Sequence, residues 1–292
     1  MEGSEKSNLQ KTLEAGEFTI TAEICPPRGA DVEHFIEKAR MLKGHVVAAN
    51  VTDNQRAVMR LSSLAASAIL VREGLEPVYQ LTCRDRNRIA MQSDLMGAWT
   101  LGIKNVLALT GDHVNCGDHR EAKPVFDLDV VQLVETITRA NNGLSLKGRE
   151  LRGGTGFFTG AVVSPEADPF DTEKIKFDKK VRAGARFFQS QAVYDMDRFR
   201  RFFDEAEKTG AKILAGILLL KSSKMAHFLN KNVPGVMVPQ ALIDEVDQAP
   251  DQLEKGIEIA ARQVKELRGY CHGAHIMAMS QEVSVPKIIA LS

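Results

Sequence analysis

Hydrophobic residues along this chain fall into short apolar runs that alternate with longer segments in which apolar residues recur every three or four positions. The short runs are typical of strands buried on both faces of a parallel sheet, and the longer segments are typical of helices that cover it. The expected strands span residues 18–24, 45–50, 77–83, 105–109, 156–163, 185–191, 212–220 and 274–279. The expected helices span residues 31–42, 61–73, 87–101, 127–140, 172–183, 195–209, 222–229, 238–247 and 252–267, and a terminal segment spans 285–291.

The order of these elements predicts one kind of α/β fold. Eight strand-then-helix units, with no two strands joined as a hairpin, favour a (β/α)8 TIM barrel. The length of 292 residues fits one such barrel, since barrels commonly need about 250 residues. A doubly wound open sheet is the alternative. We therefore expect a single domain over residues 1–292, with a flexible tail at residues 1–10 and a small hairpin, outside the repeat, within residues 144–155.

Composition and charge narrow the class of protein. Hydrophobic residues make up 44% and charged residues 26%, so the chain can bury a large core. Lysine plus arginine and aspartate plus glutamate both total 38, which leaves no net field to attract nucleic acid or an anionic membrane. The polar start of the chain lacks the apolar segment of a signal peptide, and no run approaches the roughly 18 apolar residues of a membrane helix. We expect a cytoplasmic protein, and free thiols, because the four cysteines show no CxxC spacing.

Polar side chains stand at the carboxyl ends of most expected strands. In a barrel these ends meet at one mouth, which is where ligands bind. The strand at residues 105–109 is followed at once by Thr110, Gly111, Asp112 and His113. The other strand-end side chains are Glu23, Asn50, Gln80, Thr82, Ser164, Gln189, Gln191 and His275. The set holds two carboxylates and several amides but no nucleophile beside a base, so it suits proton transfer next to a bound cofactor better than acyl or phosphoryl transfer.

Simpler interpretations apply to several of these residues. Taken singly, Glu23 would be a solvated strand-end carboxylate and Asp112 a turn cap. A possible metal cluster consists of His113, Cys116, Asp118 and His119. Because this loop lacks a second ligand pair, we expect no metal site.

Four motifs resemble those of methylenetetrahydrofolate reductases. Residues 21–28 (TAEICPPR) resemble the first-strand motif of that family, and residues 108–112 (ALTGD) resemble its fourth-strand motif. Residues 81–87 (LTCRDRN), and residues 183–185 (AGA) followed by Ser190 and Gln191, resemble further motifs in the same order. The resemblance implies a flavoenzyme of one-carbon metabolism, with FAD at the mouth of a single flavin-binding barrel. It would reduce 5,10-methylenetetrahydrofolate to 5-methyltetrahydrofolate. An unrelated barrel, such as a lyase without a flavin, is the remaining alternative.

The resemblance also implies roles for individual residues. Glu23 matches the general acid that protonates the folate ring nitrogen, and Asp112 matches the aspartate near the flavin pyrimidine edge. Gln191 matches a pterin-contacting glutamine, and Met277 falls among the substrate-binding positions. Lys180 matches a contact suited to the pyrophosphate. The full set of implied FAD contacts is Asn50, Gln80, Thr82, Asp112, Asp127, Ser164, Asp168 and Lys180.

Departures from the family pattern concern the electron donor. Gln80 stands where some members have a histidine against the flavin. Met277, Met279 and Gln281 stand where nicotinamide-using members have an aromatic residue and an arginine. Two hypotheses therefore stay open: the enzyme accepts electrons from NAD(P)H, or it is a flavin- and folate-binding catalytic subunit that is active only with an electron-delivering partner subunit. A homo- or hetero-oligomer fits either hypothesis.

Overall fold

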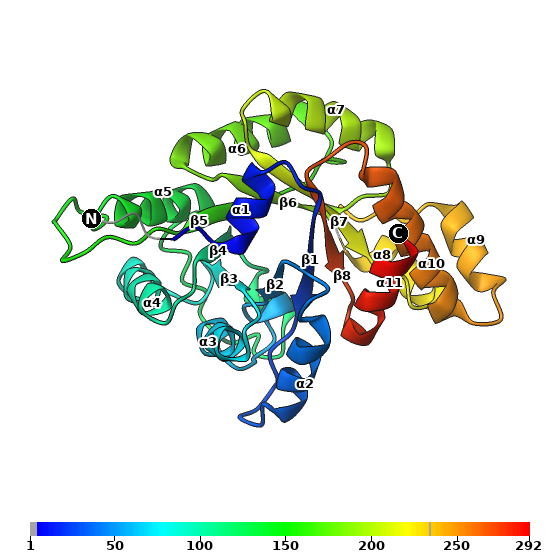
Figure 1. The fold of residues 1–292 in the computed structure, drawn as a ribbon, viewed down its shortest axis with the longest axis horizontal. Helices are drawn as coiled ribbons and strands as arrows, with labels where there is room; N and C mark the ends of the chain where they lie inside the picture. Colours follow the sequence, from blue (N-terminus) through cyan, green and yellow to red (C-terminus); the bar gives the residue numbers. More distant parts are fainter. Residues whose placement is uncertain (1–4, 234) are drawn as a thin grey trace.

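Eight parallel strands form a closed barrel in the order β1 to β8 (Figure 1). The computed structural model describes residues 5–233 and 235–292. The strands are β1 (Thr19–Ile24), β2 (Ala48–Val51), β3 (Pro77–Thr82), β4 (Asn105–Leu109), β5 (Phe158–Val163), β6 (Phe187–Ala192), β7 (Lys212–Leu218) and β8 (Gly273–Met277). Because β1 pairs with β8, the sheet has no free edge. The predicted (β/α)8 barrel is confirmed and the open sheet is excluded.

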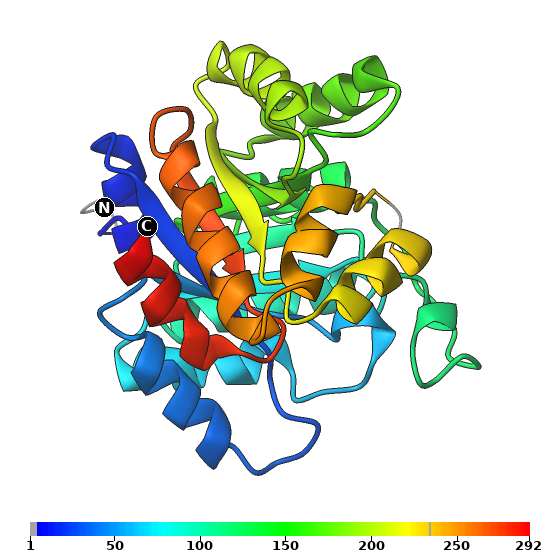
Figure 2. The same cartoon turned by 90° about the vertical axis from the view of Figure 1, so that its right-hand side faces the viewer.

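Helices surround the ring of strands, as Figure 1 shows. The helices of the repeat are α2 (Glu33–Leu42), α3 (Ser63–Glu73), α4 (Arg88–Thr100), α5 (Val130–Asn141), α6 (Phe170–Ala183), α7 (Met196–Glu207), α8 (Ser223–Asn232), α9 (Gln240–Asp247), α10 (Gln252–Leu267) and α11 (Val285–Leu291). Short 3₁₀ turns are η1 (Gln55–Ala57), η2 (Val114–Cys116) and η3 (Glu282–Ser284). The connection from β7 to β8 holds α8, α9 and α10, which lie together in Figure 2.

Local sequence sets where several helices begin and end. The Asn87 side chain accepts hydrogen bonds from the first free N–H groups of α4. Asp129 and Gln132 form a reciprocal capping box at the start of α5. Gly74 ends α3 with a left-handed φ of 73°, a conformation that costs glycine little. These signals explain why the helix predictions came close to the observed bounds.

An additional helix, α1 (Asn8–Glu14), covers the amino end of the barrel and lies across the near end of the strands in Figure 1. The backbone N–H groups of Asn8 and Leu9 donate to the Glu76 carboxylate at 2.7 and 2.9 Å. Its leucines join the apolar floor of the barrel, a cluster of Leu9, Leu13, Ala48, Val78, Leu107, Phe158, Phe187 and Leu214. The expected flexible tail at residues 1–10 is therefore wrong from Asn8 onward, and residues 1–4 lie outside the described residues.

The expected hairpin within residues 144–155 is a tight turn. Leu144 and Glu150 form an isolated antiparallel bridge. The N–H group of Ser145 donates to the Arg149 carbonyl at 2.8 Å. This excursion stands outside the strand-helix repeat, as expected.

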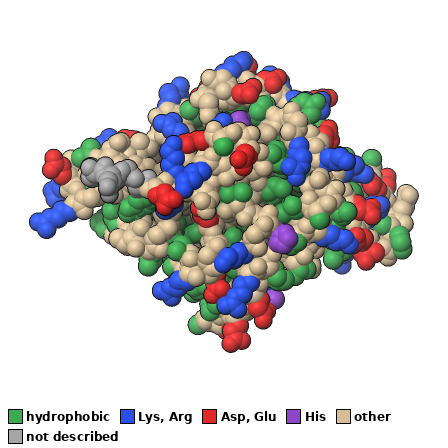
Figure 3. All heavy atoms as spheres, viewed as in Figure 1, with side chains coloured by type: hydrophobic (Ala, Val, Ile, Leu, Met, Phe, Trp, Pro, Cys, Tyr) green, Lys and Arg blue, Asp and Glu red, His purple; other side chains and the backbone are tan. Residues whose placement is uncertain are grey.

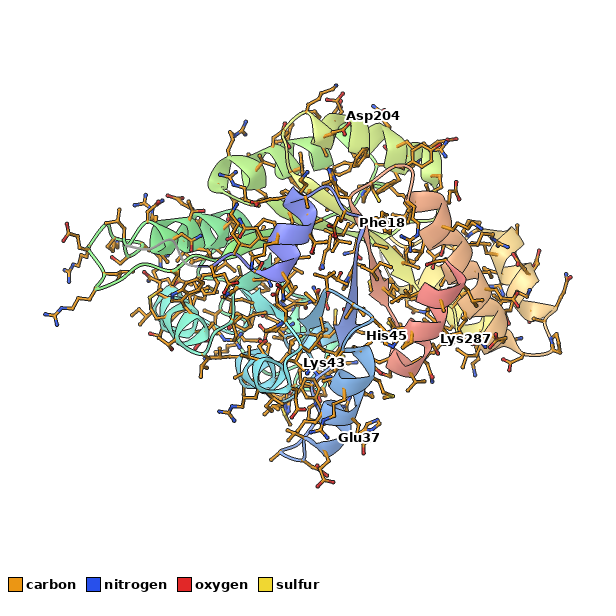
Figure 4. The ribbon with its side chains drawn as sticks, in the orientation of Figure 1. Phe18, Glu37, Lys43, His45, Asp204 and Lys287 are labelled. Carbon is orange, nitrogen blue, oxygen red and sulfur yellow. The ribbon has the colours of Figure 1, made fainter. Side chains whose placement is uncertain are left out.

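The outer surface mixes both signs of charge. Figure 3 shows acidic and basic side chains interspersed over the face that is seen in Figure 1. Ion pairs join neighbouring helices: Lys287 of α11, labelled in Figure 4, lies 2.6 Å from Glu254 of α10. Lys43, labelled in the same view, donates to the Glu73 carbonyl at the end of α3. Within the described part of the chain, no helix has the length and apolar character needed to cross a membrane.

Candidate active site

The barrel interior carries a polar layer above its apolar floor. Asn50 and Gln189, both buried, exchange two amide hydrogen bonds across the barrel, at 2.6 and 2.9 Å. Thr21 Oγ1 lies 3.0 Å from Nδ1 of His275 and 3.4 Å from the Gln189 amide nitrogen. Burial lowers the pKa of His275 to about 3, so its imidazole is neutral at neutral pH. Both polar atoms of the Asn50 amide, an implied FAD contact, are thus hydrogen-bonded to Gln189.

Glu23 lies closer to the carboxyl end of β1 than Thr21 does. It is paired with Asn50 in the register of β1 and β2. It borders a cleft of about 490 Å³. Desolvation raises the pKa of the Glu23 carboxyl to about 7, a hydrogen bond from Gln55 opposes the rise, and the nearby Glu282 adds to it. The cleft is lined by Glu23, Cys25, Arg28, Gln55, Arg56, Val58, Arg60, Cys116, Gly117, Asp118, Lys221, Met279, Ser280 and Glu282.

Asp112 is exposed and joins two mouth loops. Its Oδ2 accepts a hydrogen bond from the backbone N–H of Arg56 at 3.0 Å. Gly111, which precedes it, has a φ of 85°, and a Cβ there would meet the Thr82 Cβ at 3.0 Å. Only glycine fits this approach without displacement. The loop after β4 therefore holds the Asp112 carboxylate beside the loop after β2.

An ionic network that sequence reasoning missed lies beneath these loops. Asp53 Oδ2 accepts from both the N–H and the hydroxyl of Thr82 at 2.9 Å and from Arg86 at 2.8 Å. Arg84 is almost fully buried and donates to Asp85 and to the carbonyl oxygen of Asp112. The hydroxyl proton of Thr82, an implied FAD contact, is thus directed to Asp53. The alternating charges of residues 83–87 (CRDRN) were the feature of the sequence that could have indicated this network.

Three further implied FAD contacts form hydrogen bonds within the protein. Asp127 forms a bidentate pair with Arg88, with both side-chain distances at 2.8 Å. Lys180 is buried, and its Nζ donates to the Val162 carbonyl at 2.6 Å. Burial lowers the pKa of Lys180, and its expected contact with a pyrophosphate stays a prediction. At Ser164 the engaged group is the backbone N–H, which donates to Glu173 at 2.9 Å, and not the side-chain hydroxyl.

The remaining expected residues stay open to a ligand. Gln80 is inward-facing and 8% exposed, and its amide has no hydrogen-bond partner among the described side chains. Gln191 is exposed on β6, and Asp168 is exposed in the loop before α6. Met277 is half-buried at the end of β8 and packs, with Met279, against the apolar cluster under α8 and α9.

The loop that was considered as a metal site is held by other contacts. Asp118 accepts from the N–H of Met59 at 3.2 Å, and His119 lies 3.4 Å from Glu121. Across residues 5–233 and 235–292, no three His, Cys, Asp or Glu side chains converge as a metal ion would require. The cysteines are free thiols.

The fold and the site define a class of protein first: a (β/α)8 barrel with a protonatable carboxyl and a polar cleft at its carboxyl-end mouth, the position that catalytic side chains take in this fold. The chain belongs to the methylenetetrahydrofolate reductase family, whose pattern it matches over residues 8–292. The resemblance drawn from the motifs is thereby confirmed.

Individual relatives agree with the family. The chain is 27% identical over 264 residues to a 5,10-methylenetetrahydrofolate reductase of Pectobacterium carotovorum subsp. carotovorum, covering 86% of this chain and 82% of the relative. It is 25% identical over 276 residues to the Escherichia coli enzyme of the same name, covering 90% and 87%.

Solved structures share the fold at low identity. A Clostridium thermocellum protein that binds two copies of 5-methyl-5,6,7,8-tetrahydrofolic acid superposes with a TM-score of 0.66, at 15% identity and 97% coverage of each chain. A 2,3-dimethylmalate lyase superposes with a TM-score of 0.54, at 11% identity, covering 94% of this chain and 79% of the lyase. At such identities the likeness concerns the barrel alone.

Proposed function

We propose that this protein reduces 5,10-methylenetetrahydrofolate to 5-methyltetrahydrofolate with FAD bound at the barrel mouth. Membership of the family supports the reaction. The observation that carries the proposal for this chain is Glu23, whose carboxyl borders the cleft with a pKa raised to about 7. A carboxylic acid that keeps its proton near neutral pH can protonate the folate ring nitrogen and so open the methylene bridge.

The side chains at the mouth fit the ring of a flavin. Gln80 presents an amide that has no side-chain partner among the described residues, and this amide can both donate to and accept from the pyrimidine edge. Asp112 offers an exposed carboxylate that the Arg56 N–H orients. This fixed negative charge would stabilise a cation formed on the folate as the bridge opens. When bound, the flavin supplies the two electrons of the reduction.

Other residues at the mouth offer further candidate partners for the anionic groups of the ligands, beside the one that the sequence suggested. Lys180, which the sequence suggested for the pyrophosphate, donates to the Val162 carbonyl. The cleft itself is lined by Arg28, Arg56, Arg60 and Lys221, and none of the four pairs with a carboxylate within the described part of the chain. Guanidinium and ammonium groups in this arrangement suit the phosphates of FAD or the carboxylates of a folate.

A second candidate function differs in the source of electrons. In this candidate, the chain is the catalytic subunit of a complex and receives electrons from a partner protein in place of NAD(P)H. Met277 and Met279 are the features that favour it, because flexible thioethers at the end of β8 cannot stack as an aromatic ring would. Gln281 carries no charge with which to hold a nicotinamide nucleotide.

The experiment begins with the purified full-length chain reconstituted with FAD. Flavin absorption that survives gel filtration supports the cofactor. Dithionite-reduced protein is then mixed anaerobically with 5,10-methylenetetrahydrofolate, and 5-methyltetrahydrofolate is quantified. Formation of that product with reoxidation of the flavin supports the proposal. Absence of both flavin retention and product would overturn it.

A further inference from the structure

The Glu23 carboxyl accepts a hydrogen bond from one side chain among the described residues, and that side chain is Gln55. Gln55 Nε2 donates to Glu23 Oε1 at 3.0 Å. Gln55 belongs to η1 in the loop after β2, not to a strand, and it lies outside the four motifs of the sequence analysis. A residue that contacts the candidate acid from a neighbouring loop can set both its orientation and its proton affinity.

The direction of this hydrogen bond is set by further groups. An amide can donate or accept, so its partners decide which atom faces Glu23. Cys25 Sγ donates to Gln55 Oε1 at 3.3 Å, which leaves the amide N–H group for Glu23. Thr52 Oγ1 lies 3.2 Å from the same sulfur. Thr52, Cys25, Gln55 and Glu23 thus form one chain in which each group can donate to the next.

The thiol is suited to a permanent donor role. Burial is the main cause that raises the pKa of Cys25, and the neighbouring Glu23 carboxylate raises it further. The sulfur therefore keeps its proton across the pH range in which Glu23 titrates. Cys116, which lines the same cleft, is exposed and forms no hydrogen bond to Gln55 or Glu23 among the described residues.

The backbone of the loop is shaped to deliver Gln55. Its neighbours Asn54 and Arg56 have φ values of 46° and 57°, in the left-handed region that side chains other than glycine rarely adopt. Surrounding contacts hold this conformation. The Arg56 N–H donates to Asp112, and the Arg60 N–H donates to the Asn54 side chain at 3.0 Å.

We propose that Gln55 is the positioning residue for the Glu23 acid and that the Cys25 thiol orients Gln55. With Oε1 occupied by an N–H donor, the proton of Glu23 resides on Oε2. This oxygen has no side-chain partner among the described residues and is free to meet a ligand in the cleft. The inference rests on the proposed function only for the identity of that ligand.

The test measures the Glu23 carboxyl by ¹³C NMR titration of the full-length protein labelled in its glutamate side chains. The resonance is assigned by its loss in Glu23→Gln. Gln55→Ala should raise the pKa by about one unit, because the ionised carboxylate loses its donor. Cys25→Ala should raise the Glu23 pKa by part of that amount, because the Gln55 amide can then turn. Cys25→Ser retains a donor and should leave the Glu23 pKa near the wild-type value.

A matched control distinguishes the effect of the hydrogen-bonded chain Thr52–Cys25–Gln55–Glu23 from a general disturbance of the cleft. Cys116→Ala removes the other cleft thiol and should leave the Glu23 pKa unchanged. An unchanged pKa in both Gln55→Ala and Cys25→Ala, or an equal shift in Cys116→Ala, overturns the proposal. Should Gln55→Ala fail to fold, the comparison of Cys25→Ala with Cys25→Ser decides. The titration needs neither folate nor electron transfer. A negative result for the roles of Gln55 and Cys25 can therefore be told apart from a failure of the proposed reaction.

Discussion

Burial gives an ordinary strand-end carboxylate the proton affinity of an acid catalyst. Desolvation raises the pKa of Glu23 to about 7, and the same cause lowers the pKa of His275 to about 3. Both groups favour their neutral forms, since the low-dielectric interior disfavours either charge. The barrel interior can therefore hold one transferable proton near the mouth without a competing base deeper inside.

This titration predicts a pH dependence for folate reduction. The proposed acid role requires a protonated Glu23, so the rate of flavin reoxidation by 5,10-methylenetetrahydrofolate should be flat below pH 7 and fall as pH rises through about 7. The decline should approach about tenfold per pH unit. Stopped-flow absorption of the reduced protein across this range measures it. A rate that stays constant well above pH 7 would argue against a carboxylic acid.

The sequence alone predicted a site role for Glu23 because a motif and a strand end coincide at that residue. It could not identify Gln55, Asp53 or Arg84, whose roles come from contacts between loops that are distant in sequence. Lys180 was assigned to a pyrophosphate by resemblance. That assignment stays a prediction, and the contact that the structure adds is the hydrogen bond from Nζ to the Val162 carbonyl.

At the scale of elements, the loops after β2 and β4 form one unit. Gly117, which directly follows η2, packs so closely on η1 that an added Cβ would lie 1.8 Å from the Ala57 carbonyl oxygen. Figure 2 shows the loop after β4 on the side of the barrel opposite α1. Periodicity predicted the strands and helices of the repeat but missed α1, because seven residues with two leucines give too short a pattern. Tertiary burial, which a pattern cannot report, stabilises this helix.

The role of α1 as the barrel floor predicts a stability effect. Leu13 is fully buried, so Leu13→Ala should lower the free energy of unfolding by about 2–5 kcal/mol. Leu291→Ala is the matched control, because Leu291 is 52% exposed, and it should change the free energy by less than about 0.5 kcal/mol. Urea denaturation followed by circular dichroism measures both. Equal effects of the two substitutions would mean that α1 does not support the barrel.

On the scale of the whole molecule, closure of the sheet brings residues from all parts of the chain to one mouth. Glu23 of β1 and Met279 after β8 border the same cleft although they lie near opposite ends of the sequence. The strand pattern predicted this convergence because side chains alternate along strands and parallel strands share one carboxyl end. The details of the rim depended on loop conformations, which periodicity does not encode.

The composition of the rim at β8 predicts the behaviour toward electron donors. If Met277, Met279 and Gln281 provide no nicotinamide site, NADH and NADPH at sub-millimolar concentration should reduce the bound flavin slowly or not at all, while dithionite reduces it fully. Anaerobic stopped-flow mixing of the FAD-loaded protein with each donor measures this. Rapid bleaching of the flavin by either nucleotide would sink the partner-subunit hypothesis and favour direct NAD(P)H use.

The most direct measurement of the central claim compares wild-type protein with Glu23→Gln, both loaded with FAD and reduced by dithionite. The amide preserves the shape of the side chain but cannot donate the acid proton. We predict that the variant retains its flavin and accepts electrons normally, yet forms 5-methyltetrahydrofolate at least about 10³-fold more slowly. The melting temperature above pH 7 is the control for folding. Because the folded state raises the pKa of Glu23, ionisation of this carboxyl above pH 7 destabilises the wild-type protein. A correctly folded Glu23→Gln variant should therefore melt at a temperature no lower than wild type. Near-normal product formation by the folded variant would contradict the account.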